Sequence, residues 1–303
     1  MALGSNQVTV STAATFIPEI WSDEIVAAYK KNLVAANLFK KMSFEGKKGD
    51  TVHIPSPTRG TAALKSANTQ VTLQAATETE VVVTIDKHYE YSRVIEDIVE
   101  AQALSSLRRF YTEDAGYALG RQVDTSLIQL GRTFNGGSGV TYGGAYIGGD
   151  GTTAYTSGSS NASALTDAAI RRTIQRLDDN DVPMDGRFFL IPPSSRNTLM
   201  GLARYTEQAF VGEAGGNNTI RNGEIGNLYG IPVFVSSNCD TATGGARIAL
   251  LGHKDAAVLV EQQGVRSQTQ YKQEYLGTLY TADTLYGVAE LRDNACFALA
   301  VPA

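Results

Sequence analysis

The sequence predicts an α+β fold in which a domain with a small central sheet carries long extensions. Three observations predict it: an amphipathic stretch near the N-terminus, a two-stranded segment that is too polar to form its own core, and a very long helical pattern after it. Of the 303 residues, 43% are hydrophobic and 19% are charged. This balance provides enough apolar material for a well-formed core and excludes a disordered chain.

The first element is a helix from Pro18 to Met42. Acidic residues lie near its start and lysines near its end, an arrangement that suits the helix dipole. Its apolar side chains follow one another at spacings of three and four, so they form one stripe that must pack on another surface. The stripe consists of Trp21, Ile25, Tyr29, Leu33, Ala36 and Phe39.

Residues 46–90 predict a long two-stranded excursion. One strand covers Thr51 to Ile54 and the other Glu78 to Lys87, and between them Gly60 to Thr77 is small and polar, with Lys65 as its only charge. In the second strand one face carries Thr79, Val81, Val83 and Ile85. Because an isolated hairpin is marginally stable in water, the excursion must fold back on its own domain or lie across a neighbouring subunit.

A helical pattern without proline follows from Glu96 to Phe134. An unbroken helix of this length would be on the order of 58 Å long, several times the common length in globular proteins. The next stretch, residues 135–160, is rich in glycine, serine and threonine and predicts a long loop.

The rest of the chain predicts a small central sheet with helices and then long antiparallel strands. The expected elements are a helix from Leu165 to Asp179, a strand from Arg187 to Ile191, a helix capped by Ser194 and ending at Leu202, strands at Ile231–Val235 and Arg247–Leu251, antiparallel strands over Val258–Tyr280, and a closing strand pair within Val288–Val301.

Charge and cysteine content disfavour several classes of protein. The chain has 26 basic and 31 acidic residues, a net charge of −5, whereas a dedicated nucleic-acid binder is normally basic. The two cysteines, Cys239 and Cys296, cannot form a disulfide framework, which suits a reducing compartment. We see neither a secretory signal nor an apolar run of the roughly 18 residues that a membrane span needs, so no membrane partner is expected.

No motif for catalysis stands out. The three histidines, His53, His88 and His253, have no second ligand at metal-binding spacing, and no GxSxG nucleophile motif occurs. The acidic run at residues 178–181 faintly resembles a calcium loop, but its spacing is wrong for one. The glycine-rich loop at 135–160 contains no phosphate-binding motif. We therefore expect no catalytic residue, no metal and no cofactor.

Seven stretches in serial order carry a resemblance to a known family. They are FIPEIWSDEIVAAYKKNLV, GDTVHIPSP, DKHYEYSRVIEDIVEAQ, YTEDAGYALGRQVD, DDNDVPMDGRFFLIPP, GEIGNLYGIPVFVSSN and LLGHKDAAVLVEQQ. Over about residues 16–301 the chain resembles the major capsid proteins of tailed phages, with the Hong Kong 97 type fold, and among them podovirus-like coat proteins. No single stretch is diagnostic, since the family has no short catalytic signature.

The resemblance implies a layout in four parts. Residues 1–45 would form an N-terminal arm and residues 46–90 an extended hairpin, the E-loop. A peripheral domain with a long spine helix would use residues 91–135 and 256–283. An axial domain with a small central sheet would use residues 136–255 and 284–303.

The resemblance also implies a function. The chain would be a structural, non-enzymatic subunit of an icosahedral phage head, assembling through hexamers and pentamers in the host cytoplasm into a virion shell around double-stranded DNA, without sequence-specific binding. A portal protein is an expected partner. Because only about 17 residues precede the arm helix, a separate scaffolding protein is expected as well. Side chains expected to contact other subunits are Trp21, Ile25, Tyr29, Lys65, Val81 and Val83.

Two other hypotheses stay open at this point. An encapsulin-like nanocompartment would use the same fold around a protein cargo. A hydrolase with a site spread over loops would instead be a monomer or small oligomer with a deep pocket. Lys65 lies where some relatives form covalent links between subunits, but without an identified partner residue we do not expect such a link here.

Overall fold

The computed structural model describes residues 34–44, 49–57, 60–71, 73, 78–98, 107–158, 161–202 and 226–303. Its helices include α1 (Ala35–Leu38), α3 (Leu107–Gln129), α4 (Asp167–Asp179) and α5 (Pro193–Met200). Its strands include β1 (Lys40–Ser43), β2 (Thr51–Pro57), β3 (Glu78–Thr84), β4 (Lys87–Glu96), β5 (Tyr146–Ile147), β6 (Arg187–Ile191), β7 (Asn227–Leu228), β8 (Ile231–Val235), β9 (Arg247–His253), β10 (Ala257–Lys272), β11 (Gly277–Glu290) and β12 (Cys296–Val301).

A six-stranded sheet forms the centre of the compact body, in the order β5-β12-β9-β6-β8-β7. Its strands β6 and β12 are buried throughout, because both faces of the sheet are covered. Along β6, Phe188 and Leu190 join one core cluster, whereas Phe189 and Ile191 join the other. Helix α4 and helix α5 supply the second cluster, and α1 and the end of α3 supply the first.

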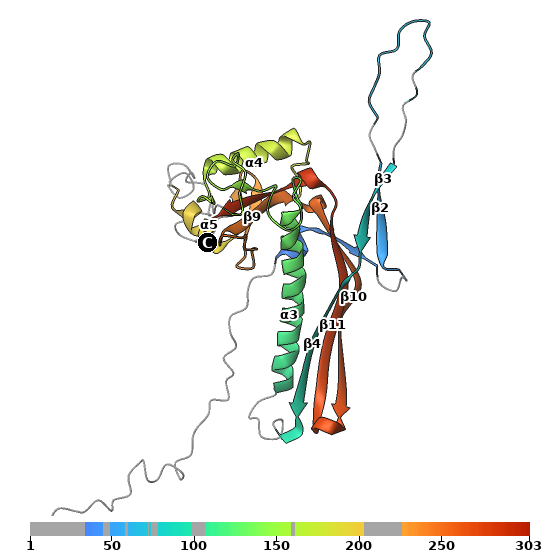
Figure 1. The fold of residues 1–303 in the computed structure, drawn as a ribbon, viewed down its shortest axis with the longest axis vertical. Coiled ribbons are helices and arrows are strands. Elements are labelled where there is room, and N and C mark those ends of the chain that lie inside the picture. The colour runs from blue at the N-terminus through green and yellow to red at the C-terminus, as the bar shows by residue number, and fades with distance from the viewer. Residues whose placement is uncertain are drawn as a thin grey trace, which may run out of the picture.

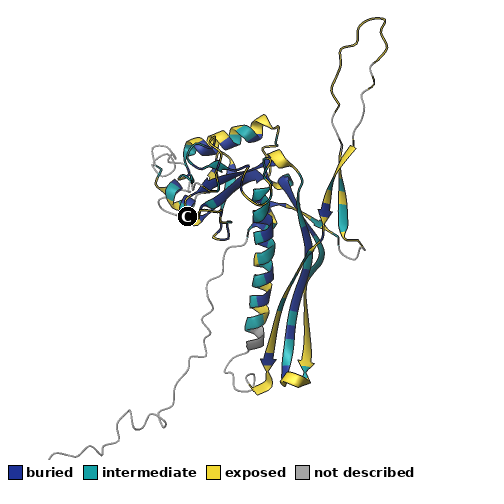
Figure 2. Cartoon of the chain, viewed as in Figure 1, coloured by how far each residue is buried: buried dark blue, intermediate teal, exposed yellow. Residues whose placement is uncertain are grey.

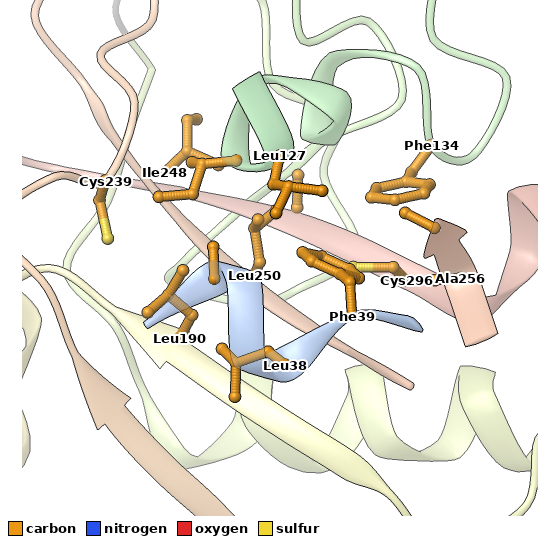
Figure 3. Close-up of a cluster of buried hydrophobic side chains, with 14 of the residues drawn as sticks. Leu38, Phe39, Leu127, Phe134, Leu190, Cys239, Ile248, Leu250, Ala256 and Cys296 are labelled. Carbon is orange, nitrogen blue, oxygen red and sulfur yellow. The ribbon is translucent and has the colours of Figure 1, made fainter. Parts of the chain in front are cut away.

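The first core cluster joins three distant parts of the chain (Figure 3). Leu38 and Phe39 come from α1 and the residue after it, Leu127 from α3, and Leu250 from β9. The rings of Phe39 and Phe188 meet edge to face with their centroids 5.1 Å apart, a contact worth about 1 kcal/mol beyond burial. The start of the described chain is therefore fixed to both α3 and the central sheet.

A second, longer sheet extends away from this body, in the order β1-β10-β11-β4 (Figure 1). Strand β10 has 16 residues and β11 has 14, so each runs on the order of 50 Å. Helix α3 lies along one face, where Ala115 and Leu119 pack with Tyr280 and Ala282. The 23 residues of α3 span about 35 Å.

Strands β2 and β3 form a third, two-stranded sheet that projects from the body (Figure 1). Between them, the described residues 60–71 and 73 contain neither helix nor strand. We call the whole segment from Thr51 to Thr84 the hairpin arm.

Many predicted elements are confirmed. The structure contains β6 and β8 with the expected bounds, α4 within two residues, and the long antiparallel pair β10–β11. The predicted alternation is confirmed from Val82 to Ile85, since Val83 and Ile85 are buried while Val82 and Thr84 are exposed. The predicted strand from Glu78 to Lys87 was too long, because β3 ends at Thr84 and Lys87 begins β4.

Both predicted long helices were too long. In the described part of the first helix, only Ala35–Leu38 is helical, and Lys40–Met42 lies in β1. The helix ends because the backbone at Phe39 is extended, and the residues after it pair in parallel with β10. The second helix was expected to begin at Glu96, but Glu96 ends β4, where it pairs with Gly277. In the described residues α3 begins at Leu107.

Smaller predictions also need correction. Ser194 does not cap α5, because the cap position is Pro192 and the Ser194 hydroxyl donates to the Pro302 carbonyl at 2.9 Å. The closing pair within Val288–Val301 does not form, since β11 and β12 belong to different sheets. The loop at 135–160 includes the short strand β5, which pairs with β12.

Candidate assembly surface

The hairpin arm is held together by its backbone ladder and by a few side-chain contacts. Strands β2 and β3 pair antiparallel from Thr51 opposite Thr84 to Pro57 opposite Glu78. The Thr79 hydroxyl donates to the Ser56 carbonyl at 2.8 Å. Proline is tolerated in β2 because a two-stranded sheet leaves one side of each strand unpaired.

The base of the arm packs on the rest of the chain. Val83 and Ile85 form a buried cluster with Val258 and Val260 of β10. The Ile85 amide also donates to the Asp50 carbonyl at 2.8 Å. The described part of the arm therefore leaves the body from a packed base.

The tip of the arm is exposed to solvent throughout its described residues (Figure 2). Three of its apolar side chains are uncovered: Leu64 is 98% exposed, Leu73 is 90% exposed and Val71 is 61% exposed. A turn at Asn68, which has a φ of 63°, is closed by the Thr69 hydroxyl donating to the Ser66 carbonyl at 2.7 Å. These three side chains are left uncovered by the described part of the chain, which makes the tip a candidate contact surface.

A second exposed apolar group lies at the far end of the long sheet. Ile98, Tyr275 and Leu276 are exposed where β4 ends and β10 turns into β11. This turn is ordered, since the Asp97 amide donates to the Leu276 carbonyl at 3.0 Å and the Tyr271 hydroxyl donates to Asp97 at 2.7 Å. The hydrogen bond to Asp97 raises the pKa of Tyr271 above its ordinary value.

A polar cluster ties three strands of the long sheet together. The Asp283 carboxylate on β11 lies 3.2 Å from His88 Nε2 on β4 and accepts from Gln263 Nε2 on β10 at 3.0 Å. The Arg266 guanidinium, also on β10, holds the pKa of Asp283 below its usual range. The cluster lies where the β10–β11 register shifts, between Gln263 and Arg266.

One depression in the described surface, of about 280 Å³, is lined in part by Asp181, His253, Asp255 and Arg292. Both ring nitrogens of His253 are engaged, since Nε2 lies 2.7 Å from the Asp185 carbonyl and Nδ1 accepts from the Asp255 amide at 3.1 Å. That histidine is therefore already saturated with hydrogen bonds and is not free to act as a base.

The burial of the two cysteines and the spacing of the described acidic groups bear on thiol reactivity and on metal binding. Both cysteines are buried, and burial raises the pKa of Cys239 to about 12, so its thiol stays protonated. Within the described ranges, no three His, Cys, Asp or Glu side chains gather closely enough to hold a metal ion. The described helices also include none long and apolar enough to cross a membrane.

The structure separates the side chains predicted to contact other subunits. Lys65 lies at the exposed tip of the arm and Val81 is partly buried in β3. Val83 is 0% exposed and packs inside its own chain, so it presents no surface to another molecule. Trp21, Ile25 and Tyr29 lie outside the described residues.

Sequence reasoning missed the exposed apolar side chains of the arm tip and of the β10–β11 turn. The signal for Leu64, Val71 and Leu73 was available, because they are isolated apolar residues in a polar segment without an opposing strand. The exposure of Leu276 could not be predicted, because it depends on where the turn between β10 and β11 lies. The alternating pattern of that region does not locate this turn.

Comparisons with known proteins agree on one family. A family model described as phage capsid protein matches residues 61–295, so the chain belongs to the phage capsid protein family. It is a structural subunit of a phage capsid. A comparison with curated proteins gives no match.

Solved structures show the same fold. A chain of Mycobacterium phage Che8 is 24% identical with a TM-score of 0.74, and the match covers 94% of this chain and 97% of that one. The capsid of Cyanophage P-SCSP1u is 21% identical with a TM-score of 0.77, covering 99% and 96%. The mature capsid of bacteriophage PhiM1 is 15% identical with a TM-score of 0.70, covering 94% and 92%. The chain therefore has the Hong Kong 97 type capsid fold.

Proposed function

We propose that the chain builds an icosahedral phage head by assembling through hexamers and pentamers into a shell around double-stranded DNA. The observation that carries this proposal is the hairpin arm, whose base is buried in the chain and whose tip exposes the apolar side chains of Leu64, Val71 and Leu73. Such a segment gains burial only when another molecule covers it. In a shell of identical subunits, that molecule is a second copy of the chain.

The energetics suit cooperative assembly. Fully burying one leucine or valine side chain contributes about 1.5–3 kcal/mol, and ordering the tip offsets part of that gain. One arm contact is therefore modest. In a closed shell the same contact is repeated at every subunit, so the assembled particle is stable although each pair of subunits binds weakly.

The four-part layout is part of the proposal. The N-terminal arm would be residues 1–45 and the E-loop residues 46–90. The peripheral domain, residues 91–135 and 256–283, would hold α3 and most of the long sheet. The axial domain, residues 136–255 and 284–303, would hold the six-stranded sheet. Strand β11 crosses the boundary at residue 283 and would join the two domains rigidly.

The proposed partners follow from a structural role. A portal protein and a separate scaffolding protein would act with the chain during assembly in the host cytoplasm. The net charge of −5 disfavours tight binding of the enclosed DNA, which suits a container that later releases its content. We propose no enzymatic activity, because His253 is saturated with hydrogen bonds and the Cys239 thiol stays protonated.

Negative-stain electron microscopy of the protein, expressed with its scaffolding protein, tests the proposal. We expect closed shells or capsomers, and deletion of residues 60–77 should leave a folded monomer that forms neither. Equal particle yield from the deletion variant would refute the role of the arm. Mass spectrometry of purified particles should find DNA with portal or tail proteins, whereas a co-purifying enzyme cargo would favour a nanocompartment.

A further inference from the structure

One margin of the long sheet is unpaired over half of its length. Strand β10 pairs with β11 from Ala257 to Lys272, but on its other side β1 pairs only with Val258–Glu261. Among the described residues, no strand continues the ladder on that side beyond Glu261 (Figure 1). We call residues 264–272 of β10 the open edge.

The open edge is bare on both of its faces. Its seven consecutive residues from Val265 to Tyr271 are exposed, whereas the first four residues of β10 are buried (Figure 2). A depression of about 520 Å³ lies beside it, lined by Gln268, Thr269, Gln270, Leu279 and Thr281. Because an unpaired strand margin is a template for another strand, the open edge is suited to receive one.

The open edge also lacks the features that usually block such pairing. Edge strands are commonly protected by proline or by several charged side chains. The open edge contains no proline, and its only charged residues are Arg266 and Lys272. The Arg266 guanidinium is bound to Asp283 on β11, so it is held towards its own sheet. The five residues between the two charges are neutral.

We propose that two copies of the chain join their open edges in an antiparallel ladder, about a two-fold axis at Gln268. This inference rests on the proposed function, because it requires copies of the chain to assemble. A two-fold contact uses the same surface on both copies. The open edge must therefore be complementary to its own reversed sequence.

The open edge meets this condition when the axis passes through its central residue, Gln268. Its two exposed apolar side chains, Val265 at 59% and Tyr271 at 48%, then lie opposite each other, and symmetry repeats the contact. Cross-strand pairs of an aromatic and a β-branched residue contribute roughly 0.2–1 kcal/mol each. The Tyr271 hydroxyl is already bound to Asp97 at 2.7 Å, which holds the ring in place for this contact.

Neighbouring registers are less favourable. Moving the axis by one residue towards the C-terminus would place Arg266 opposite Lys272 of the second copy, and like charges directly opposite are destabilising. Moving it by one residue towards the N-terminus would separate Val265 from Tyr271. Charge and apolar contact therefore select the same register, and that register also uses all nine residues of the open edge.

The contact is small. A stable interface between two proteins buries about 1,200–2,000 Å², and a nine-residue edge covers less than that. We therefore expect the ladder in assembled particles, where many contacts act together, and not as a tight dimer of free subunits.

A disulfide across the two-fold axis tests the proposal in assembled particles. In Gln268→Cys the two new thiols would lie on directly opposite residues, whose Cα atoms are about 4.5–5.5 Å apart in an antiparallel ladder, within reach of a disulfide. The natural cysteines, Cys239 and Cys296, are buried. Oxidation should therefore convert most of the chain into covalent dimers and nothing larger, because each chain has one such contact.

The matched control is Gln270→Cys, which changes an exposed residue two positions along the same strand. Its two copies would lie four residues apart along the ladder, about 14 Å, which is too far for a disulfide. This variant should remain monomeric after oxidation. Covalent dimers from Gln270→Cys as abundant as those from Gln268→Cys would overturn the register.

Charge variants test whether Gln268 meets itself. Gln268→Lys alone and Gln268→Glu alone would each place like charges opposite each other, so particle yield should fall by about fivefold or more. Co-expression of the two variants should restore the yield, because mixed pairs attract. Since Gln268 is exposed, both variants should unfold at the denaturant concentration of the unmodified protein.

The outcomes separate this inference from the proposed function. If the unmodified chain forms no particles with its scaffolding protein, the proposed function fails. If particles form but Gln268→Cys stays monomeric, another segment such as the hairpin arm covers the open edge, and the two-fold ladder is wrong. Failure of the mixed charge variants to restore particle yield would overturn the ladder as well.

Discussion

Asp283 on β11 accepts two hydrogen bonds from the Arg266 guanidinium on β10, from Nε at 3.1 Å and from Nη2 at 2.8 Å. The pair crosses the ladder at the register shift, where regular backbone pairing between β10 and β11 is interrupted. A bidentate contact fixes two strands in one relative position more strictly than a single hydrogen bond does. We infer that this pair sets the local register of the long sheet.

Replacing Asp283 should weaken the long sheet in a pH-dependent way. Its pKa is lowered in the folded chain by Arg266 first, so the stabilisation is fully present above the ordinary value of about 3.9. The stabilisation is lost as pH falls through the lowered pKa. Because Arg266 is exposed to solvent, Asp283→Asn should lower the melting temperature at pH 7 by only about 1–3 °C.

Thermal melts of both proteins at pH 7 and at acid pH would check this expectation. The difference between them should shrink as the pH is lowered. Asp179→Asn, at the exposed end of α4, is the control and should melt like the unmodified protein at both pH values. A difference that grows towards acid pH would contradict the assigned direction.

Replacing either of two glycines by alanine should change the stability of the chain, in opposite directions at the two positions. A Cβ at Gly252 on β9 would lie 2.6 Å from both Cβ and Sγ of Cys296 on the neighbouring strand. Gly252→Ala should therefore destabilise the chain by about 1–3 kcal/mol. A Cβ at Gly116 on α3 meets nothing within 4 Å, so Gly116→Ala should stabilise the helix by about 0.5–1 kcal/mol. Urea unfolding of both variants measures the two changes, and a Gly252→Ala variant as stable as the unmodified protein would refute the packing described for β9 and β12.

The core between the two sheets should be sensitive to truncation. Leu250 is fully buried beside Leu127 and Leu38 in the first core cluster (Figure 3). Leu250→Ala should lower the free energy of unfolding by about 2–5 kcal/mol. The control is Val140→Ala, because Val140 is largely exposed and its truncation should change that free energy by less than about 0.5 kcal/mol. Denaturant titration distinguishes these results.

The leucines of the arm tip should affect assembly but not folding. Because Leu64 and Leu73 contact little of their own chain, the double variant Leu64→Ser with Leu73→Ser should unfold at the same denaturant concentration as the unmodified protein. Its particle yield, measured by sedimentation and electron microscopy, should fall by at least about tenfold. Met184→Ser replaces an apolar residue of the body that is also largely exposed, at 79%, and should assemble normally. Normal assembly of the double variant would show that the tip is not part of the contact surface between subunits.

How far the sequence predicts this fold depends on the range of the interactions involved. The alternation ending at Val83 and Ile85 and the buried run of β6 are local patterns, and both were predicted correctly. Lys40 to Met42 follow helical spacing, yet they form β1 because β10, far along the chain, supplies a partner strand. A local pattern carries no information about such a partner.

The candidate surface shows the same limit. The exposed position of Lys65 could be predicted from the polarity of its neighbours. The burial of Val83 against its own chain could not be predicted, because it depends on Val258 and Val260, which are distant in the sequence. The contacts of the buried Asp124 could not be predicted either, since a single aspartate within a helical pattern gives no sign that it will meet Ala35 and Asn238.

The connectivity of the long sheet has a mechanical consequence. The chain enters the hairpin arm from β1 and leaves it into β4, and these two strands are the opposite edges of the same sheet. A force that pulls on the arm would therefore be shared between the two edge strands. The backbone hydrogen bonds that join these edges to β10 and β11 would resist it. An attachment through two edge strands resists this force better than an attachment through one strand, whose hydrogen bonds would break one after another.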